Sequence, residues 1–430
     1  MFLRRREMSE AAIAKKNGWQ TGRWGLLTAG VVMLAFLGGI VWPDVFRLSG
    51  VNAIAPIFSD LIAILAAGES DQMGRDVFKH NPLDPFNRPH VYGPWWLVVG
   101  DLGLVRADAR WLGLLLAGGF LLTAVRTLRP ADWRSALMAT MLLGSPPVLL
   151  AMERGNNDLV IYLLLVAAAW SIVSATWFKS SIASGVVILA AALKFYPVVV
   201  LPMLAAMQAS GKRICWLIAG TVVVGSAILL GSWKVYQQVL AMAPEPMTIF
   251  GYGAKLSYYL VLTMPEHRGW LITGALPVMG IAIWLGWRWR KGFWTMLPTT
   301  GFTTACYVAG ALSWGVCYAS TISFPYRMVL LLLPAALGLR SQSMGKVSYA
   351  MRFQWVTTAL LMWSPCAKEH LLLLSADESH FSGSWFAWYF LGIEHALALI
   401  ISVSLGLALL GWLYRRLGVS SIISSAAKVN

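Results

Sequence analysis

The sequence of 430 residues contains few charged side chains. Asp, Glu, Lys and Arg make up only 12% of it, whereas 58% of the residues are hydrophobic. A soluble globular protein carries about a quarter charged residues, so this composition excludes an ordinary soluble domain. Apolar runs close to the ~20 residues that cross a bilayer recur along the chain. We therefore expect an all-α, polytopic integral membrane protein that forms one domain over residues 1–430.

Cysteine and internal repetition are also scarce. The four cysteines lie in or beside apolar runs, and their spacing does not match a metal site. We predict no structural disulfide and no zinc site. We also expect no cofactor and name no metal ligands, and leave open whether a metal assists. The absence of an internal repeat argues against a transporter built from inverted repeats. The first apolar run lacks a small-residue cleavage pattern and is expected to remain as a span.

The positive charge is confined to short segments between apolar runs. The net charge is +15, and the basic segments are residues 4–16, 126–134, 212–213, 288–291, 340–352 and 415–416. Basic residues concentrated in cytoplasmic loops are typical of membrane proteins, so we exclude nucleic acid as a partner and expect membrane lipids around the chain. Residues 1–23 and the tail 414–430 are then cytoplasmic.

Alternation of basic and acidic or mixed loops predicts about ten crossings, with residues 43–105 as a long first outer loop. The predicted crossings are residues 24–42, 110–128, 136–152, 158–178, 215–233, 270–287, 293–312, 325–339, 353–370 and 385–413. Residues 234–267 form a second outer segment. The oligomeric state is left open.

The stretch 181–208 does not fit a simple crossing, because both of its flanks are basic. Two full crossings would need about 40 residues, so we predict a broken, re-entrant hairpin around Lys194 and Pro197. Irregular backbone at membrane depth is tolerated only where it is buried in protein or lines a cavity. Lys194 either snorkels to an interface or holds a phosphate or carboxylate, and we favour the second interpretation.

The densest polar cluster, "ERGNND", stands directly before an apolar run. It can be a solvated turn in which Asp158 caps the following helix. Alternatively, Glu153, Arg154 and Asn157 line or brace a polar cavity at the outer face, and Arg154 offers donors to an anionic group.

The first outer loop opens on an amphipathic pattern that suits a short helix on the outer leaflet, with Asp60 in its first turn. Asp60 is either an acid favoured by the helix dipole or a catalytic group. The following stretch, "GRDVFKHNPLDPFNRPHVYGPWW", mixes charges, turn residues and aromatics that could contact a sugar or headgroup. Its candidate binding residues are Asp84, Arg88, His90 and Tyr92.

A late motif, "SFPYRMVLLLLP", places Arg327 at the outer start of a span. Arg327 is either an interfacial anchor or part of a site, and the neighbouring Ser323 and Tyr326 indicate a shaped helix start.

These motifs together resemble glycosyltransferase family 87, within the C-type superfamily of integral-membrane glycosyltransferases. The resemblance rests on "SDL" and "YGPWW" at the two ends of the first outer loop, then "ERGNND", "AAALKFYPVVVLP" and "SFPYRMVLLLLP", and it spans residues 60–334. In the mycobacterial mannosyltransferase branch the late motif carries a Trp and paired His. Phe324, Pro325, Tyr326 and Arg327 stand there instead, which leaves the sugar and the acceptor open.

The resemblance implies inverting transfer of a hexose or pentose from a polyprenyl-phosphate donor to a lipid- or glycan-linked acceptor. The reaction would take place at the outer face of a bacterial cell membrane, in glycolipid or polysaccharide synthesis. An acidic residue of the first outer loop acts as general base in this superfamily, and Asp60 matches it, with Asp71, Asp76 and Asp84 as competitors. Lys194, Arg327 and Arg154 are the candidates for holding the donor phosphate. The other candidates for binding or bracing substrate are Glu153, Asn157, Asp158, Tyr196, Tyr326, Asp84, Arg88, His90 and Tyr92.

Two other functions are compatible with a polytopic chain. A flippase or transporter of lipid-linked sugar could also use Lys and Arg within the membrane, but it does not need a long first outer loop with an acidic helix start. A purely structural subunit leaves Lys194 without a reason.

Overall fold

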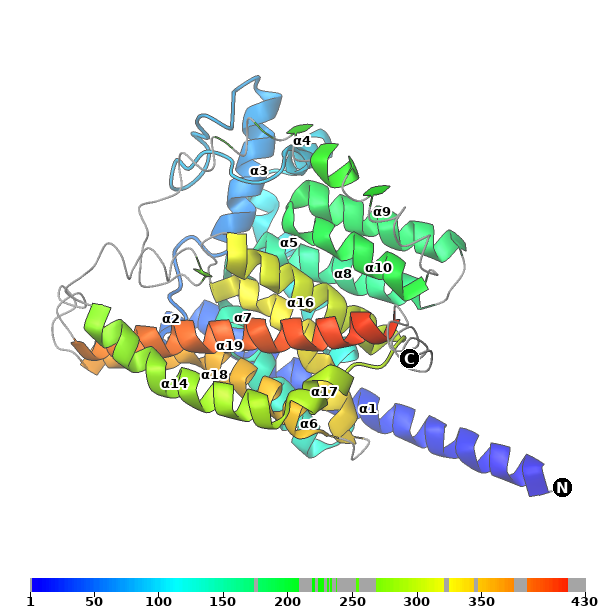
Figure 1. The fold of residues 1–430 in the computed structure, drawn as a ribbon. Coiled ribbons are helices and arrows are strands. Elements are labelled where there is room, and N and C mark those ends of the chain that lie inside the picture. The colour runs from blue at the N-terminus through cyan, green and yellow to red at the C-terminus, as the bar shows by residue number, and fades with distance from the viewer. Residues whose placement is uncertain are drawn as a thin grey trace.

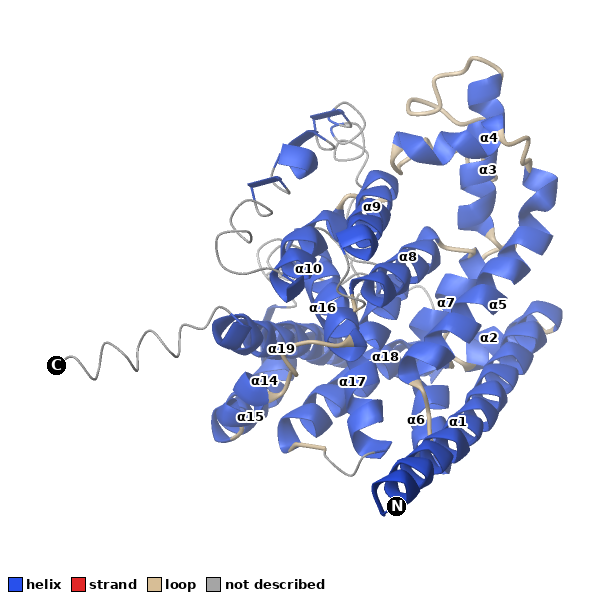
Figure 2. Cartoon of the chain, turned by 90° about the vertical axis from the view of Figure 1, so that its right-hand side faces the viewer, coloured by secondary structure: helices blue, strands red, loops and turns tan. Residues whose placement is uncertain are grey.

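The computed structural model describes residues 2–173, 177–208, 268–320, 325–343, 347–374 and 385–416, together with scattered residues between 219 and 254. Throughout these ranges the regular structure is helical and contains no strand (Figure 2), which confirms the predicted all-α architecture. The helices in chain order are α1 (Phe2–Val41), α2 (Pro43–Leu48), α3 (Ser59–Gln72), η1 (Pro94–Leu97), α4 (Val98–Asp101), η2 (Arg106–Asp108), α5 (Ala109–Leu128), α6 (Trp133–Leu143), α7 (Pro146–Arg154), α8 (Asn157–Ile172), α9 (Trp177–Leu193), η3 (Tyr196–Val200), α10 (Leu201–Gln208), α14 (Arg268–Arg288), α15 (Arg290–Thr295), α16 (Phe302–Ser320), η4 (Pro325–Leu331), α17 (Leu332–Ser343), α18 (Tyr349–Leu374) and α19 (Trp385–Arg416).

Four of the described helices have the length and apolar composition needed to cross a membrane. They are Gly22–Val41 within α1, Arg106–Leu128 around α5, α14, and Trp388–Arg416 within α19. A fifth span arises if α6 and α7 count together, although they bend by 55° at their break. The predicted total of about ten crossings therefore stays a prediction.

Several of the predicted crossings are not single continuous helices. Crossing 136–152 is split into α6 and α7, since Pro146 holds the preceding Ser145 in extended backbone with a ψ of 152°. Crossing 158–178 contains the end of α8 and the start of α9, and crossing 293–312 runs from α15 into α16. Turns of this kind interrupt apolar runs that hydropathy alone treats as single helices.

The predicted break at Lys194 is confirmed. Helix α9 ends at Leu193, and the chain continues as the 3₁₀ segment η3 before α10 begins at Leu201. Pro197 lies in the first turn of η3 and cannot donate a backbone hydrogen bond, so it ends the α-helical pattern. The re-entrant path predicted for this hairpin stays a prediction. Crossing 215–233 and outer segment 234–267 lie outside the described residues, apart from scattered positions.

Residues 43–105, for which the sequence predicts the first outer loop, contain short helices as predicted; we keep the name outer loop for this segment. Helix α3 opens at Ser59, next to Asp60, and its inner face buries Ile64 and Leu65. It packs against α4 through a pair of glycines, because a Cβ on Gly68 would lie 2.8 Å from the backbone nitrogen of Gly100. Figures 1 and 2 both place α3 and α4 at the same end of the molecule.

The C-terminal helices pack lengthwise, with α14 and α18 beside α19 (Figure 1). Helix α1 begins and α19 ends on the same side of the molecule in Figure 1. There, Arg415 donates to the carbonyl of Leu297 at 2.7 Å, and Arg416 donates to the carbonyl of Ala206 at 2.9 Å. The opposite end of α1 leads into α2 and the first outer loop.

Candidate active site

The first turn of α3 is held against the end of α7. Phe58, which precedes the helix, adopts a left-handed conformation with a φ of 62° and donates its backbone N–H to the carbonyl of Glu153 at 2.7 Å. The side chain of Glu153 accepts a second bond, 3.3 Å from the backbone nitrogen of Ile54. These bonds hold the start of the outer-loop helix against the "ERGNND" segment. Ile54 and Glu153, which form the second bond, are 99 residues apart in the chain.

Asp60 is buried, with only 4% of its surface exposed. The side-chain amide of Asn156 donates to its Oδ2 at 2.7 Å. Its Oδ1 lies 3.4 Å from Nη1 of Arg88 and 3.9 Å from Nη1 of Arg154. The position at the N-terminal turn of α3 also favours a negative charge, through the helix dipole. Asp60 is therefore a buried carboxylate among donors from two other segments of the chain, the loop at Arg88 and the turn at residues 154–156.

Arg88 joins Asp60 to a second buried carboxylate, that of Asp84. Its Nε lies 3.1 Å from Oδ2 of Asp84, and its Nη2 donates to the carbonyl of Ser59 at 3.3 Å. Burial on its own would lower the pKa of Arg88, but Asp84 and Asp60 outweigh it and raise the pKa. Arg88 and Asp84 thus brace Asp60 inside the outer loop.

The other acidic competitors lie apart from this arrangement. Asp71 and Asp76 are exposed, and Asp76 pairs with Lys79 at 3.1 Å. An exposed carboxylate with a nearby lysine is what an ordinary solvated loop contains.

Lys194 is paired inside the protein. Its Nζ lies 2.6 Å from Oδ1 of Asp158 and 2.8 Å from Oδ1 of Asn157. It also lies 5.7 Å from the ring of Tyr92 and 5.9 Å from the rings of both Tyr196 and Tyr326. The ammonium is therefore held by carboxylate, amide and aromatic faces, and does not snorkel.

The interpretation of Asp158 as a solvated helix cap is wrong. Asn156 is the N-cap of α8, and its Oδ1 accepts from the backbone N–H of Asp158 at 2.9 Å. Asp158 is fully buried, and its Oδ1 also accepts from the hydroxyl of Tyr196 at 2.5 Å. Its carboxylate is available to Lys194 because the preceding asparagine performs the capping.

The end of the outer loop docks onto the broken helix. The backbone N–H of Gly93 lies 3.4 Å from the carbonyl of Leu193, and the indole N–H of Trp96 donates to the same carbonyl at 3.2 Å. The break after α9 leaves that carbonyl without a helical partner. Only glycine fits at position 93, because a Cβ there would lie 2.1 Å from the carbonyl of Ala192.

His90 supports the adjacent Tyr92. Its ring lies 5.5 Å from the ring of Phe78 on one side and 5.7 Å from that of Tyr92 on the other. Burial lowers the pKa of His90 to about 4, so the ring is neutral at pH 7. His90 therefore packs edge-on against the ring of Tyr92 and has a supporting role beside the charged groups.

Tyr326 and Arg327 enter from the first turn of η4. The carboxylate of Asp158 interacts electrostatically with Arg327, while Tyr326 interacts with Asp60 and Asp158. Phe324 lies outside the described residues. The structure thus brings the late motif to the same place as Asp60 and Lys194.

We call this assembly the polar cluster. Its members are Ser59, Asp60, Asp84, Arg88, Glu153, Arg154, Asn156, Asn157, Asp158, Lys194 and Arg327. Within the part of the chain that the structure describes, five of its buried polar atoms have no hydrogen-bond partner: Ser59 Oγ, Glu153 Oε2, Arg154 Nε, Asn157 Nδ2 and Asp158 Oδ2. Such atoms are rare in folded proteins, and several together mark a place for water or a ligand.

Asn156 and Ser59 are the members that the sequence analysis did not name as candidates, and Asn156 is the one that contacts Asp60 directly through its side chain. The signal available was the preference of asparagine for the helix N-cap, since Asn156 precedes an apolar helix by one residue. The sequence could not show that the same amide reaches Asp60, which is 96 residues away in the chain.

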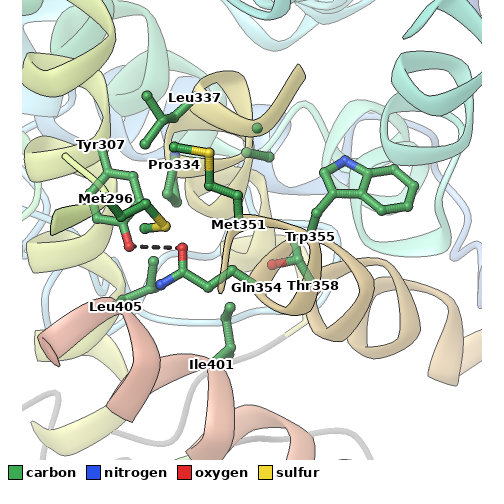
Figure 3. A pocket seen from close by; sticks show the side chains of 12 residues that line it. Met296, Tyr307, Pro334, Leu337, Met351, Gln354, Trp355, Thr358, Ile401 and Leu405 are labelled. Carbon is green, nitrogen blue, oxygen red and sulfur yellow. Dashed lines mark hydrogen bonds between the residues drawn. The ribbon is translucent and has the colours of Figure 1, made fainter. Parts of the chain in front are cut away.

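A separate small cavity lies between α16, α17, α18 and α19 and contains no acidic or basic side chain (Figure 3). Its polar lining includes Tyr307, whose hydroxyl donates to Oε1 of Gln354 at 2.9 Å. Elsewhere, Lys368 of α18 and Glu394 of α19 form a buried ion pair at 2.7 Å that the sequence analysis did not identify. Neither feature includes a residue of the polar cluster. Among the described residues, no three His, Cys, Asp or Glu side chains are grouped to hold a metal.

Comparison with known proteins gives one match. The model of glycosyltransferase family 87 matches residues 96–321, just over half of the chain. The matched region contains the "ERGNND" segment and Lys194, whereas Asp60 and Arg327 lie outside it. No curated protein and no solved structure matches the chain.

Proposed function

Because the chain belongs to glycosyltransferase family 87, a family of C-type membrane glycosyltransferases, we propose that it transfers a sugar from a polyprenyl-phosphate donor. The acceptor is a hydroxyl group of a lipid- or glycan-linked molecule, and the configuration at the anomeric carbon is inverted. Family membership favours this transferase over the flippase.

The observation that carries the proposal is the contact of one buried carboxylate with a group of cations. Asp60 lies 3.9 Å from Arg154. Asn156 connects Asp60 to Asp158, which pairs with Lys194 and interacts electrostatically with Arg327. A base and a set of phosphate-binding cations are the two elements that this reaction requires.

In the proposed reaction, the acceptor hydroxyl approaches Asp60. Its O–H bond breaks and the proton passes to the carboxylate of Asp60, while the oxygen forms a bond to the anomeric carbon. The bond from that carbon to the phosphate oxygen breaks on the opposite face, and its electron pair remains on the polyprenyl phosphate. Attack from the face opposite the leaving group produces inversion.

The leaving polyprenyl phosphate can depart without a proton, because cations and N–H donors can stabilise its negative charge. An ammonium has three N–H donors, and Asn157 and Asp158 occupy two of those on Lys194. The third can point to a phosphate oxygen, together with Nε of Arg154, which lies 4.0 Å from Oε2 of Glu153 and makes no hydrogen bond to the described residues. Charge-assisted bonds of this kind stabilise the developing negative charge in a site that excludes water.

We propose that the reaction takes place at the outer face of a bacterial cell membrane, with both termini in the cytoplasm. Helix α1 begins and α19 ends on the same side of the molecule, where Arg415 and Arg416 also lie (Figure 1). The first outer loop follows the other end of α1, and it supplies Asp60 and Arg88 to the polar cluster.

The substitution Asp60→Asn tests the proposal. Membranes that contain the protein are incubated with a panel of radiolabelled polyprenyl-phosphate hexoses and pentoses, and transfer of label to membrane lipid or glycan is measured. Loss of the base should lower turnover by about 10²- to 10⁴-fold, while donor binding and thermal unfolding change little. Asp76→Asn, at the exposed pair with Lys79, is the matched control and should transfer normally. Near-normal turnover of Asp60→Asn would remove Asp60 from the mechanism.

A further inference from the structure

Asn156 connects the turn between α7 and α8 to the carboxylate of Asp60. Gly155, with a φ of +56°, closes α7 and directs the chain back, so that the backbone N–H of Asn156 donates to the carbonyl of Ala151 at 2.9 Å. A Cβ on Gly155 would lie 3.0 Å from Cβ of Leu61 in the first turn of α3. The turn therefore rests directly on the helix that carries Asp60.

Two bonds fix the orientation of the Asn156 amide. Its Oδ1 caps α8 by accepting from the backbone N–H of Asp158 at 2.9 Å. The NH₂ group must then point the other way, where Nδ2 donates to Oδ2 of Asp60 at 2.7 Å. Asn156 is completely buried, so water does not compete for either bond.

The two oxygens of Asp60 consequently differ. Oδ2 accepts one short hydrogen bond, from Asn156, whereas Oδ1 accepts only a long one, 3.4 Å from Nη1 of Arg88, and lies 3.9 Å from Nη1 of Arg154. We infer that Asn156 is a positioning residue that occupies Oδ2 and thereby reserves Oδ1 of Asp60 for the acceptor hydroxyl. This inference rests on the proposed role of Asp60 as the base. The acceptor proton moves to Oδ1, and the N–H of Asn156 remains on Oδ2 before and after the transfer.

Substitutions that keep the helix cap separate positioning from folding. Serine is a good N-cap but is too short to reach Asp60, and aspartate is a good N-cap that replaces the donor by a carboxylate oxygen. Loss of a hydrogen bond to a charged group should lower kcat by about 10- to 100-fold in Asn156→Ser, with KM for the donor within about threefold of the parent. Asn156→Asp should lower kcat at least as far, because like charges then face each other.

A cap elsewhere in the chain supplies the control. Asp132 is the N-cap of α6, and its Oδ1 accepts from the backbone N–H of Ser135 at 2.8 Å. Asp132→Ala should lower the thermal unfolding temperature and leave kcat of the folded protein unchanged. Asn156→Ser should instead lower kcat and leave the thermal unfolding temperature nearly unchanged.

The experiment measures kcat, KM and thermal unfolding of the full chain, with the same labelled polyprenyl-phosphate sugars, for the parent, Asn156→Ser, Asn156→Asp, Asp132→Ala and Asp60→Asn. A kcat of Asn156→Ser within twofold of the parent, where Asp60→Asn is inactive, overturns the inference and leaves the proposed function standing. A raised KM with unchanged kcat also overturns it, because Asn156 would then bind substrate. Turnover by Asp60→Asn contradicts the proposed function itself.

Discussion

Two groups of buried charges in this molecule can be compared, the polar cluster and the ion pair between Lys368 and Glu394. The pair joins α18 to α19 at 2.7 Å, and in the described part of the chain neither residue has a buried polar atom without a hydrogen-bond partner. The polar cluster contains four cations and four carboxylates, yet five of its buried polar atoms lack a hydrogen-bond partner among the described residues, and two of the five, Arg154 Nε and Glu153 Oε2, face each other at 4.0 Å. The hydrogen-bonding groups of the ion pair are satisfied within the protein, whereas the polar cluster has donors and acceptors without a hydrogen bond to the part of the chain that the structure describes.

The difference indicates what each group is for. Burying charge is costly in both places. In the pair, the ammonium and the carboxylate offset each other's burial, so the pair serves to hold two helices in register. In the polar cluster, the donors and acceptors left over can be used by a substrate. Unpartnered buried atoms therefore separate a site from a structural contact better than the number of charges does.

The largest effect is expected at the ion pair. Lys368→Met leaves Glu394 buried without its cation, which should lower the free energy of unfolding by about 3–5 kcal/mol. The double variant Lys368→Met/Glu394→Met should regain most of that stability. Thermal unfolding in detergent checks the first statement, and sugar transfer per folded molecule should match the parent in the double variant. A double variant as unstable as the single one would mean that the loss of stability does not come from an unpaired Glu394 carboxylate.

The same double-substitution test should give a different result in the polar cluster. Lys194→Met removes the ammonium that pairs with Asp158 and leaves the buried carboxylate with the Tyr196 hydroxyl and Arg327, and adding Asp158→Asn removes that charge. Stability should recover in the double variant, but affinity for the polyprenyl-phosphate donor should stay about 10- to 100-fold below that of the parent, because a charge-assisted bond is missing. Donor binding is measured directly with the labelled lipids. Full recovery of donor affinity would assign Lys194 to structure alone.

Acid should loosen the loop segment around His90, which packs against Tyr92 beside the polar cluster. Burial lowers the pKa of His90 in the folded protein from the ordinary value of 6.5 to about 4. The stability that neutral His90 provides is therefore complete above about pH 6.5 and is lost as the pH falls from there toward 4. Between pH 7 and 5 this amounts to about 2 kcal/mol.

A substitution isolates that contribution. His90→Phe keeps an aromatic ring between Phe78 and Tyr92 and should lose less stability between pH 7 and 5 than the parent does. Hydrogen exchange of the backbone around residues 77–93, followed over that pH range, reports the opening of the outer loop. Identical pH dependence in parent and variant would exclude His90 as the cause.

Much of the fold follows from the sequence, because apolar runs and basic segments depend on local composition. The outer-loop helix at Asp60 and the break at Lys194 were predicted from an amphipathic pattern and from Pro197. The bend at Pro146 was missed, since hydropathy averages over a window and does not register a tight turn within an apolar run. The number of crossings depends on how short, bent helices lie in a membrane, which composition cannot specify.

The site was predictable to a similar degree. Charges in apolar surroundings are expensive, so Lys194 and Arg327 stood out, and the structure brings both to Asp158. The choice of partner was not predictable. Asp158 and Asn156 are both good helix caps, and only the packing of α3 against the α7–α8 turn decides that asparagine caps while aspartate holds the lysine.

The docking of the outer loop on the carbonyl of Leu193 also has a consequence for synthesis. Trp96 donates to a residue that follows it by 97 positions. At roughly 5–20 residues per second, that carbonyl is made about 5–20 s after the loop that binds it. We expect the loop to wait undocked during this interval, with Asp60 and Tyr92 already translated and the broken helix still inside the ribosome. The candidate base would then acquire its phosphate-binding neighbours only at a late stage of membrane insertion.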